Sequence, residues 1–403
     1  MSYGETDKRS QLLETLQKSK IDRLNEAGLA GASKSFPCGL HDSDIDPQQE
    51  RKTLKVMVTG HLGYIGTVLA PLLQDAGHDV VGLDIDLYRE CTFGKEPRRI
   101  PELRKDIRDV SAADLAGFDA VLHLAALSND PLGNLNPELT YEINYRASVS
   151  LAESARAAGV SRFVFSSSCS TYGAGGDDLL DETAAFNPVT PYGRSKVLVE
   201  QELAKLANDK FSPVFLRNAT AYGVSPRLRF DLVLNNLVAW AMCTGRVLIK
   251  SDGTPWRPVV HIEDISAAFL AMLQAPQEKI HNRAFNIGRQ EENYRIRDLA
   301  QIVKEVVPNC SIEYAADGGP DKRCYRVDFS RVGREVPEFK PKWTARAGAQ
   351  ELYETYRQVG LKVEDFEGPR YMRIDHIRAL LASGKLDAAL RLQGPLEAAI
   401  TQG

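Results

Sequence analysis

The sequence predicts an α/β fold, a doubly wound parallel sheet followed by a smaller, mainly helical region. Between residues 54 and 218, short apolar runs alternate with helical stretches, which is the pattern of strands covered by helices on both faces. A glycine-rich turn joins the first run to the first helix, and beyond residue 218 the alternation becomes irregular. These three observations place a parallel sheet in the first half and a helical cap, interleaved with the last sheet strands, in the second.

The expected strands are short, and the helices between them have recognisable ends. Strands are expected at 54–58, 78–85, 120–125, 162–166 and 213–217, with one more ending near residue 107. Helices are expected from the glycine-rich turn to residue 76 and at 138–158, 192–208, 230–245, 264–274, 296–307 and 345–359. Gly77 and Gly159 follow two of these helices, where a glycine commonly caps the last turn.

Four segments follow from this division. Residues 1–52 form an N-terminal extension, with a charged helical stretch at 10–29, which we expect to pack on the surface or on a partner subunit. Residues 53–220 form the sheet domain and residues 221–364 the region that binds the substrate. Residues 365–403 form an additional helical tail.

Composition and charge exclude several classes of function. The 403-residue chain has a net charge of −4 and no basic excess that would support nucleic-acid binding. Its six cysteines contain no C-x-x-C pair and its seven histidines no pair at metal-ligand spacing, so we expect no metal. No apolar run reaches the roughly 18 residues of a membrane span, and the N-terminus lacks a secretory or transit pattern. We therefore expect a cytoplasmic protein that binds neither nucleic acid nor membrane.

Residues 59–66, with the sequence TGHLGYIG, fit the pattern G-x-x-G-x-x-G between a strand and a helix. Glycines let the chain turn tightly and let its backbone approach a pyrophosphate, which meets the positive end of the helix. The pattern predicts a Rossmann-type dinucleotide site that includes Gly60, Gly63, Tyr64, Ile65 and Gly66.

Acidic residues at two later strand ends extend this site. Asp84 ends the second strand about 18 residues after Gly66, where a carboxylate accepts hydrogen bonds from ribose hydroxyls. Because it would repel a 2′-phosphate, NAD is favoured over NADP. Asp86 is a second candidate for this role. Asp106 and Ile107 are expected beside the adenine, although Asp106 is also placed to cap a helix.

Tyr192 and Lys196 lie four residues apart and share one face of the predicted helix. Pro191 places the tyrosine at the helix start, where the helix dipole favours an anion. The lysine one turn away favours tyrosinate further, so we expect the pKa of Tyr192 to fall from its usual value near 10 toward working pH. Tyr192 is thus a candidate general base for a hydroxyl proton.

A run of three serines ends the fifth strand, in the sequence FSSSCSTYG at 165–173. Ligands of open α/β sheets bind outside the carboxyl ends of the strands. A serine hydroxyl there can bond the same substrate oxygen as the tyrosine. Serine runs at strand ends are otherwise ordinary loop caps, and the Tyr192 helix about 24 residues later favours the functional interpretation.

With these motifs the chain resembles the NAD-dependent epimerase/dehydratase branch of the extended short-chain dehydrogenases, over about residues 54–335. The resemblance implies that Ser168, the third serine of the run, joins Tyr192 and Lys196 in catalysis. It also implies that Lys196 holds the nicotinamide ribose. In relatives the strand beside the nicotinamide matches the sequence HLAA at 123–126, and a helix asparagine matches Asn144. Further cofactor contacts are therefore expected from Leu124, Ala125 and Ala126.

The resemblance also implies a nucleotide diphosphate sugar as substrate. Arg257, in the sequence GTPWRPVVHIED, matches an arginine that contacts the diphosphate in relatives. Asn236 and Arg323 match positions near further substrate contacts, while an ordinary surface role is the alternative for each. Ser170 and Asn218 are expected at the same site, and Arg227 and Arg229 add charge that suits a diphosphate.

Two departures from the family pattern bear on the reaction. Sugar 4,6-dehydratases follow the catalytic hydroxyl with an Asp-Glu pair, whereas this chain has Cys169 and Ser170. Reductases that also epimerise carry a cysteine where this chain has Ser170. The interpretation is therefore an epimerase that acts at the sugar C4 through a 4-keto intermediate, with a 4-ketoreductase or dehydrogenase as the alternative and a 4,6-dehydratase less favoured.

Three expectations remain open from the sequence. An NAD-sensing protein without catalysis would not need the tyrosine and lysine on one helix face. A hydroxysteroid-type dehydrogenase would share the catalytic set, but would line its second half with apolar residues. The resemblance further implies a homodimer through the helices at 138–158 and 192–208.

Overall fold

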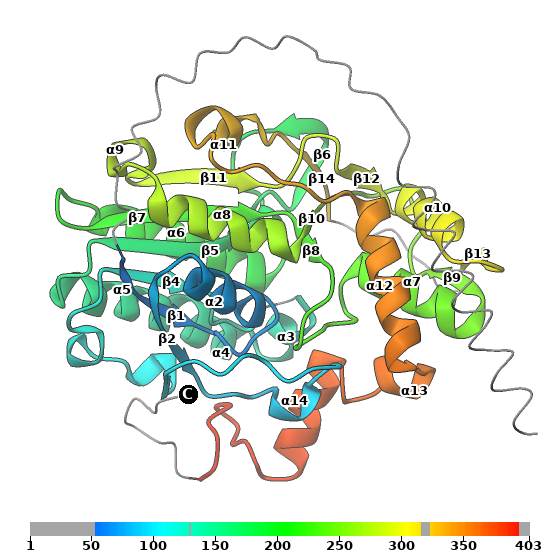
Figure 1. The fold of residues 1–403 in the computed structure, drawn as a ribbon, viewed down its shortest axis with the longest axis horizontal. Helices are drawn as coiled ribbons and strands as arrows, with labels where there is room; N and C mark the ends of the chain where they lie inside the picture. The colour runs from blue at the N-terminus through cyan, green and yellow to red at the C-terminus, as the bar shows by residue number, and fades with distance from the viewer. Residues whose placement is uncertain (1–52, 129, 316–322, 395–403) are drawn as a thin grey trace, which may run out of the picture. The chain divides into compact units, whose positions relative to one another are not determined.

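A parallel sheet of seven strands organises the part of the chain that the structure, a computed structural model, describes: residues 53–128, 130–315 and 323–394. All neighbouring strands in this sheet run parallel (Figure 1). Their order is β11 (Arg283–Ile287), β7 (Ser212–Asn218), β5 (Arg162–Ser168), β4 (Ala120–His123), β1 (Lys55–Thr59), β2 (Asp79–Asp84) and β3 (Glu102–Arg104). The predicted Rossmann-like α/β class is confirmed.

The strand order reverses beside β1. The chain builds β1, β2 and β3 outward in one direction and then returns to add β4 on the other side of β1. A crevice forms at such a switch point, outside the carboxyl ends of the strands, because the following loops diverge to opposite sides. The fold therefore places the glycine-rich turn and the serine run, which follow β1 and β5, at one edge of the sheet.

Helices cover both faces of the sheet. One face carries α2 (Gly66–Asp75) and α8 (Ile262–Gln274), and the other carries α5 (Ala147–Ala157) and α6 (Pro191–Leu206) (Figure 1). Strands buried on both faces explain the continuous apolar runs in the sequence, such as the fully buried centre of β1.

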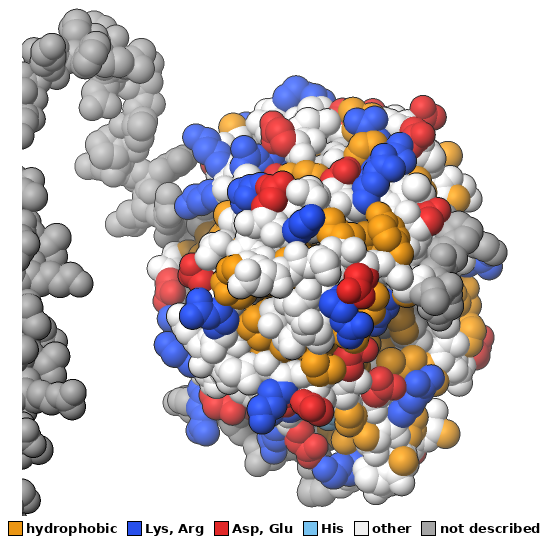
Figure 2. Space-filling view, turned by 90° about the vertical axis from the view of Figure 1, so that its right-hand side faces the viewer, with side chains coloured by type: hydrophobic (Ala, Val, Ile, Leu, Met, Phe, Trp, Pro, Cys, Tyr) orange, Lys and Arg blue, Asp and Glu red, His pale blue; other side chains and the backbone are white. Residues whose placement is uncertain are grey.

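The second half adds a helical unit with its own apolar core. Its main helices are α7 (Val233–Thr244), α10 (Ile296–Val306) and α12 (Ala345–Val359), close to their predicted positions. Two short strands, β9 (Arg246–Ile249) and β13 (Ser311–Tyr314), pair beside them. On the face shown in Figure 2, basic, acidic and hydrophobic side chains are interspersed.

Smaller elements connect the two halves. One small sheet contains β8 (Thr220–Tyr222), β10 (Trp256–His261) and β12 (Asn293–Arg295), and another pairs β6 (Ala174–Leu180) with β14 (Cys324–Val327). The remaining helices are α3 (Asp130–Leu135), α4 (Pro137–Thr140), α9 (Gln277–Ile280), α11 (Ser330–Glu335), α13 (Val363–Phe366) and α14 (Arg373–Ala382). Short 3-10 turns occur at Arg89–Cys91, Ile107–Asp109, Ala112–Leu115 and Cys169–Thr171.

The helix predicted at 138–158 consists of three consecutive pieces. Asn136 caps α4 by accepting a hydrogen bond from Leu139 N, and Pro137 occupies the first helical position. A π-helical turn, Tyr141–Arg146, then leads into α5. The period of the apolar residues does not reveal such a turn, because it inserts extra length without ending the helix.

The predicted tail at 365–403 is described as far as residue 394 and contains α14. Apolar residues of this segment pack with Leu127, Leu132 and Leu139 of the sheet domain. The tail therefore returns to the first half of the fold (Figure 1). The extension at 1–52, including the helix predicted at 10–29, lies outside the described residues. Among those that are described, no helix is long and apolar enough to span a membrane.

Candidate active site

A cavity of about 970 Å³ opens at the carboxyl ends of the sheet strands. Its walls come from the segments that follow β1, β2, β3, β4, β5 and β7, from the start of α6 and from the second half of the chain. The sequence motifs therefore converge on one site. No group of three or more metal-ligating side chains occurs among the described residues.

The glycine-rich turn is shaped so that side chains cannot fill it. Gly60 has a φ of +74°, and a Cβ there would lie 2.7 Å from Ala125 N. A Cβ at Gly66 would lie 2.3 Å from Gly60 O, and Gly63 N donates to that same oxygen at 3.0 Å. The backbone is thus packed closely below the turn while Gly60, Gly63, Tyr64, Ile65 and Gly66 line the cavity above it. Such a cradle fits a dinucleotide pyrophosphate at the start of α2.

Asp84 lies beside the turn, at the end of β2. Its carboxylate accepts hydrogen bonds from Leu62 N at 3.0 Å and Asp86 N at 2.8 Å. Burial raises the pKa of this carboxyl group. Asp84 lines the cavity with its oxygens fixed by the backbone, which suits the predicted contact with ribose hydroxyls. Asp86, the second candidate, also lines the cavity but pairs with arginines.

The other predicted cofactor residues differ in whether their polar groups already bond to the protein. Ile107, Leu124, Ala125 and Ala126 line the cavity. Asp106 lines it too, but its carboxylate caps the following turn through Arg108 N and pairs with the Arg108 guanidinium at 2.6 Å. Asp106 therefore caps the following turn and also lies in the cavity wall, where a contact beside the adenine was expected.

Asn144 does not line the cavity, contrary to the expectation of a direct cofactor contact. Its side chain is buried in the π-helical turn, where Oδ1 accepts from Leu127 N at 2.7 Å and Nδ2 donates to Leu127 O at 3.0 Å. Both ends of the amide therefore hold the loop after β4. Residues of that loop, and not Asn144, line the cavity.

Tyr192 and Lys196 both reach the cavity from the first turns of α6. Thr190 caps this helix by accepting a hydrogen bond from Gly193 N at 3.1 Å. The Lys196 ammonium lies 5.7 Å from the centre of the Tyr192 ring and donates to Ser166 O at 2.7 Å. The bond to Ser166 anchors α6 to the end of β5.

The charges around this pair differ from the expectation. Burial, and after it the charge of Asp130, raises the pKa of Tyr192 to about 12, although a hydrogen bond with Ser168 acts in the opposite direction. Burial also lowers the pKa of Lys196 to about 7. The pKa of Tyr192 in the protein without its cofactor therefore lies above its usual value, opposite to the predicted direction, because desolvation outweighs the lowering effects of Ser168 and Arg229.

The serine run offers polar atoms to a ligand. Ser168 Oγ accepts from Ser170 N at 3.1 Å, and Tyr192 lines the same cavity. Ser170 Oγ and Asn218 Oδ1 are buried and have no hydrogen-bond partner among the described residues. Because Ser168, Ser170 and Asn218 all line the cavity, the unsatisfied atoms are positioned for a polar substrate.

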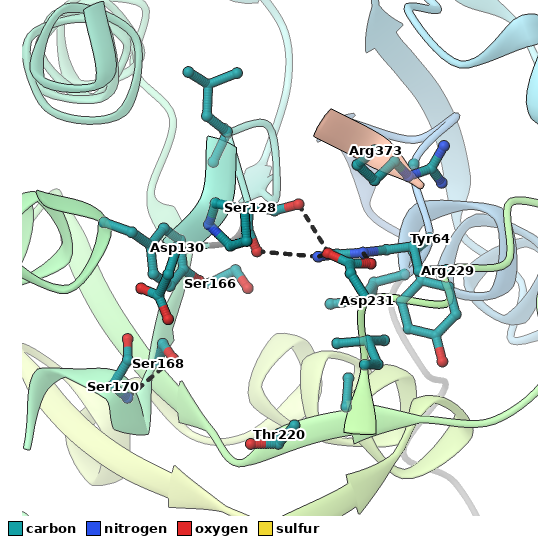
Figure 3. A pocket seen from close by; sticks show the side chains of 18 of the residues that line it. Tyr64, Ser128, Asp130, Ser166, Ser168, Ser170, Thr220, Arg229, Asp231 and Arg373 are labelled. Atoms are coloured by element: carbon teal, nitrogen blue, oxygen red, sulfur yellow. Dashed lines mark hydrogen bonds and ion pairs between the residues drawn. The ribbon is translucent and has the colours of Figure 1, made fainter. Parts of the chain in front are cut away.

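The expected substrate residues of the second half divide into two groups. Asn236, Arg229, Arg257 and Arg323 line the cavity. Arg227 does not, because its guanidinium is turned to Asp86 at 3.4 Å and to the Thr92 hydroxyl. Arg229 is held by two hydrogen bonds to Asp231 and by one to Ser128 Oγ (Figure 3).

The sequence profile described as the NAD dependent epimerase/dehydratase family matches residues 56–288. The chain belongs to this family. A UDP-glucose 4-epimerase of Rhizobium leguminosarum bv. trifolii is 38% identical over 273 residues, covering 62% of this chain and 81% of the relative. UDP-glucuronic acid decarboxylase 1 of Arabidopsis thaliana is 25% identical over 358 residues, covering 86% and 77%. The solved structure of MoeE5 in complex with UDP-glucuronic acid and NAD has a TM-score of 0.65 at 26% identity, covering 75% of this chain and 99% of that one.

Membership of an NAD-dependent family makes this chain an NAD-dependent enzyme, as the motifs predicted. That Asp130 lines the cavity was not predicted from the sequence. Asp130 begins α3 after β4, accepts from the Thr190 hydroxyl at 2.6 Å and pairs with Arg323 at 2.5 Å. It lies near Ser168 and Ser170 in the cavity (Figure 3). An acid followed by Pro131 just after a central strand was the available signal, but it equally predicts a helix start.

Proposed function

We propose that this epimerase/dehydratase inverts the C4 centre of a nucleotide diphosphate sugar through a 4-keto intermediate. The observation that carries the proposal is that the hydroxyl-bearing residues Ser168 and Tyr192 line one cavity, with Lys196 anchored beside the tyrosine. Two adjacent hydroxyl groups can hold and deprotonate a single carbinol oxygen.

Each residue of the pair has a distinct role in the proposal. The Tyr192 phenol takes the proton of the C4 hydroxyl while the Ser168 hydroxyl holds the same oxygen. When bound, NAD supplies a hydride acceptor and donor for C4 and, in its oxidised state, a positively charged ring that favours tyrosinate. The 4-keto sugar then turns in the cavity so that the opposite face of C4 would receive the hydride back from the reduced cofactor, and Tyr192 returns the proton to the C4 oxygen. Lys196, held by Ser166 O, fixes the distance between α6 and the serine run.

The cofactor is proposed to lie along the glycine-rich turn, with its adenosine ribose at Asp84 and its nicotinamide ribose at Lys196. The nucleotide diphosphate of the substrate is proposed to contact Arg257 and Arg323, with Asn236 nearby. Support comes from the two guanidinium groups, which line the same cavity as the serine run. The three similar proteins named above have a UDP-sugar in their name or in their solved complex.

A 4-ketoreductase or dehydrogenase would use the same three residues and is the second candidate. Elimination of water is less favoured because Cys169 is buried and donates to Arg217 O, so it does not face the cavity as an acid would. Burial raises the pKa of this thiol, which keeps it protonated.

Replacement of the phenol tests the proposal. We expect Tyr192→Phe to lower kcat by about 100- to 10,000-fold with NAD affinity changed only slightly, because the proton acceptor is lost and the ring remains. Tyr353→Phe, on α12 outside the cavity, is the matched control and should keep full activity. Full activity of the Tyr192→Phe variant would overturn the mechanism.

We also propose a homodimer that associates through the helices α5 and α6, as the resemblance implied. The expected mass from light scattering after size exclusion is twice that of one chain. A monomeric mass at micromolar concentration would refute this part of the proposal.

A further inference from the structure

We propose that Arg373, carried by the C-terminal segment, binds the diphosphate of the dinucleotide cofactor. The segment, residues 371–394, would then form part of the cofactor site. This inference rests on the cofactor placement proposed above, and nothing in the sequence motifs assigned a ligand to this segment.

The Arg373 side chain is buried without full hydrogen bonding. It is 2% exposed, its Nη2 donates to Arg227 O at 2.7 Å, and its guanidinium stacks 3.8 Å from the centre of the Tyr88 ring. Nη1 has no hydrogen-bond partner, and no ion pair is recorded for this guanidinium among the described residues. Its charge also acts on the buried Cys91 thiol. A buried cation without a counter-ion is costly, and an anion in the cavity would remove that cost.

The position of Arg373 along the cavity indicates which anion it would meet. Tyr88, on which it stacks, lies four residues after Asp84, at the proposed ribose end of the cofactor. Figure 3 shows Arg373 on the same side of the cavity as Tyr64 of the glycine-rich turn and Arg229, across from Ser168, Ser170 and Asp130. The guanidinium thus lies away from the hydroxyl groups that react and near the phosphate turn.

The local charges favour an anion at this point. Arg229 is neutralised by two bonds to Asp231, and Arg227 faces Asp86. Arg373 adds a third buried guanidinium to these two carboxylates, and the Arg229 charge acts on it unfavourably. Among these five side chains the positive charges exceed the negative ones by one, and an anion beside Arg373 would balance that charge.

The C-terminal segment is held firmly enough to position Arg373. His376 Nε2 donates to Leu87 O at 2.9 Å, and Arg108 Nη1 donates to Ala389 O at 2.8 Å. Leu390, which lines the cavity with a φ of +55°, packs with Leu127 and Leu132. Contacts at both ends of the segment thus fasten it over the loops that follow β2, β3 and β4.

Binding measurements on cofactor-free, full-length protein test the inference. The variants are Arg373→Gln and, as matched control, Arg378→Gln, which removes an exposed arginine of the same helix that pairs with Asp375 at 3.2 Å. The ligands for titration calorimetry are NAD, ADP-ribose, adenosine and uridine diphosphate. Melting temperature without ligand reports any damage to the fold.

We expect Arg373→Gln to weaken the binding of NAD and of ADP-ribose about 10- to 100-fold, because a charge-assisted hydrogen bond to a buried anion is lost. In the same variant the dissociation constants of adenosine and of uridine diphosphate should change less than about threefold. The control Arg378→Gln should leave the dissociation constants of all four ligands unchanged. Equal weakening of adenosine and ADP-ribose would show a structural role and overturn the inference. Selective weakening of uridine diphosphate would assign Arg373 to the substrate instead, and unchanged ADP-ribose affinity would refute binding altogether. Loss of turnover by Tyr192→Phe, which tests the proposed function, is independent of these outcomes.

Discussion

Lys196 is buried with its ammonium 4.6 Å from the Phe165 ring centre and bonded to a single carbonyl oxygen, Ser166 O. Burial lowers its pKa from 10.5 to about 7. The unfolded chain therefore binds one more proton than the folded chain between about pH 7 and pH 10.5. Its charge opposes folding fully below pH 7, and this penalty is relieved as the pH rises.

We expect the free energy of unfolding of the wild type to rise relative to that of Lys196→Met by about 1 kcal/mol per pH unit between pH 7 and pH 9. Other titrating groups cancel in this difference because both proteins contain them. Denaturant unfolding at a series of pH values measures it. A difference that does not vary with pH would show that Lys196 remains charged in the folded protein.

Asp84 should determine the choice between NAD and NADP. In Asp84→Asn the charge that repels a 2′-phosphate is lost while one amide oxygen can still accept a backbone hydrogen bond. We expect the ratio of the dissociation constants for NADP and NAD to fall about tenfold. Asp79→Asn, at the exposed start of the same strand, is the control and should leave the ratio unchanged. An unchanged ratio in Asp84→Asn would place the adenosine ribose elsewhere.

At the residue scale, the sequence predicted those members of the site that belong to short local motifs. The glycines of the turn and the Tyr192–Lys196 pair are examples, because helical spacing and strand ends fix their relative positions. Arg373 and Asp130 were not predicted, since each meets its neighbours only through tertiary contacts. The raised pKa of Tyr192 was also missed because burial cannot be read from spacing.

At the scale of elements, a buried ion pair joins β7 to α6, the helix that carries Tyr192. Arg217 donates to Glu200 at 2.7 Å and also reaches the Tyr172 phenol at 3.0 Å, and Ser167 Oγ bonds to the same glutamate. Both charged side chains are 5% exposed. The pair couples the serine run of β5 to the helix that carries Tyr192.

We expect Arg217→Met to lower the free energy of unfolding by about 3–5 kcal/mol, because Glu200 would stay buried without its partner. The double variant Arg217→Met, Glu200→Met should recover most of this loss. Lys205→Met, which breaks an exposed pair with Glu202 on the same helix, should cost less than about 1 kcal/mol. A double variant no more stable than Arg217→Met would contradict this account of the coupling.

At the scale of the whole molecule, the sheet domain could be predicted because buried parallel strands give continuous apolar runs separated by helices of recognisable length. The contribution of the second half to the main sheet was foreseen only in general terms. Strand β11 is far from β7 in the sequence, and nothing local in its segment shows that the two strands pair. The packing of the tail on Leu127, Leu132 and Leu139 of the sheet domain is likewise a long-range contact that periodicity does not encode.

The central claim is inversion at C4 without net oxidation. The most direct test is to incubate the enzyme and NAD with UDP-glucose, UDP-galactose and UDP-glucuronic acid in turn. Proton NMR follows the configuration at C4 and absorbance at 340 nm follows NADH. We predict that at least one of these sugars interconverts with its C4 epimer while the absorbance stays constant. Accumulation of one NADH per sugar consumed, or loss of a carboxyl group or of water from the sugar without inversion, would contradict the proposal.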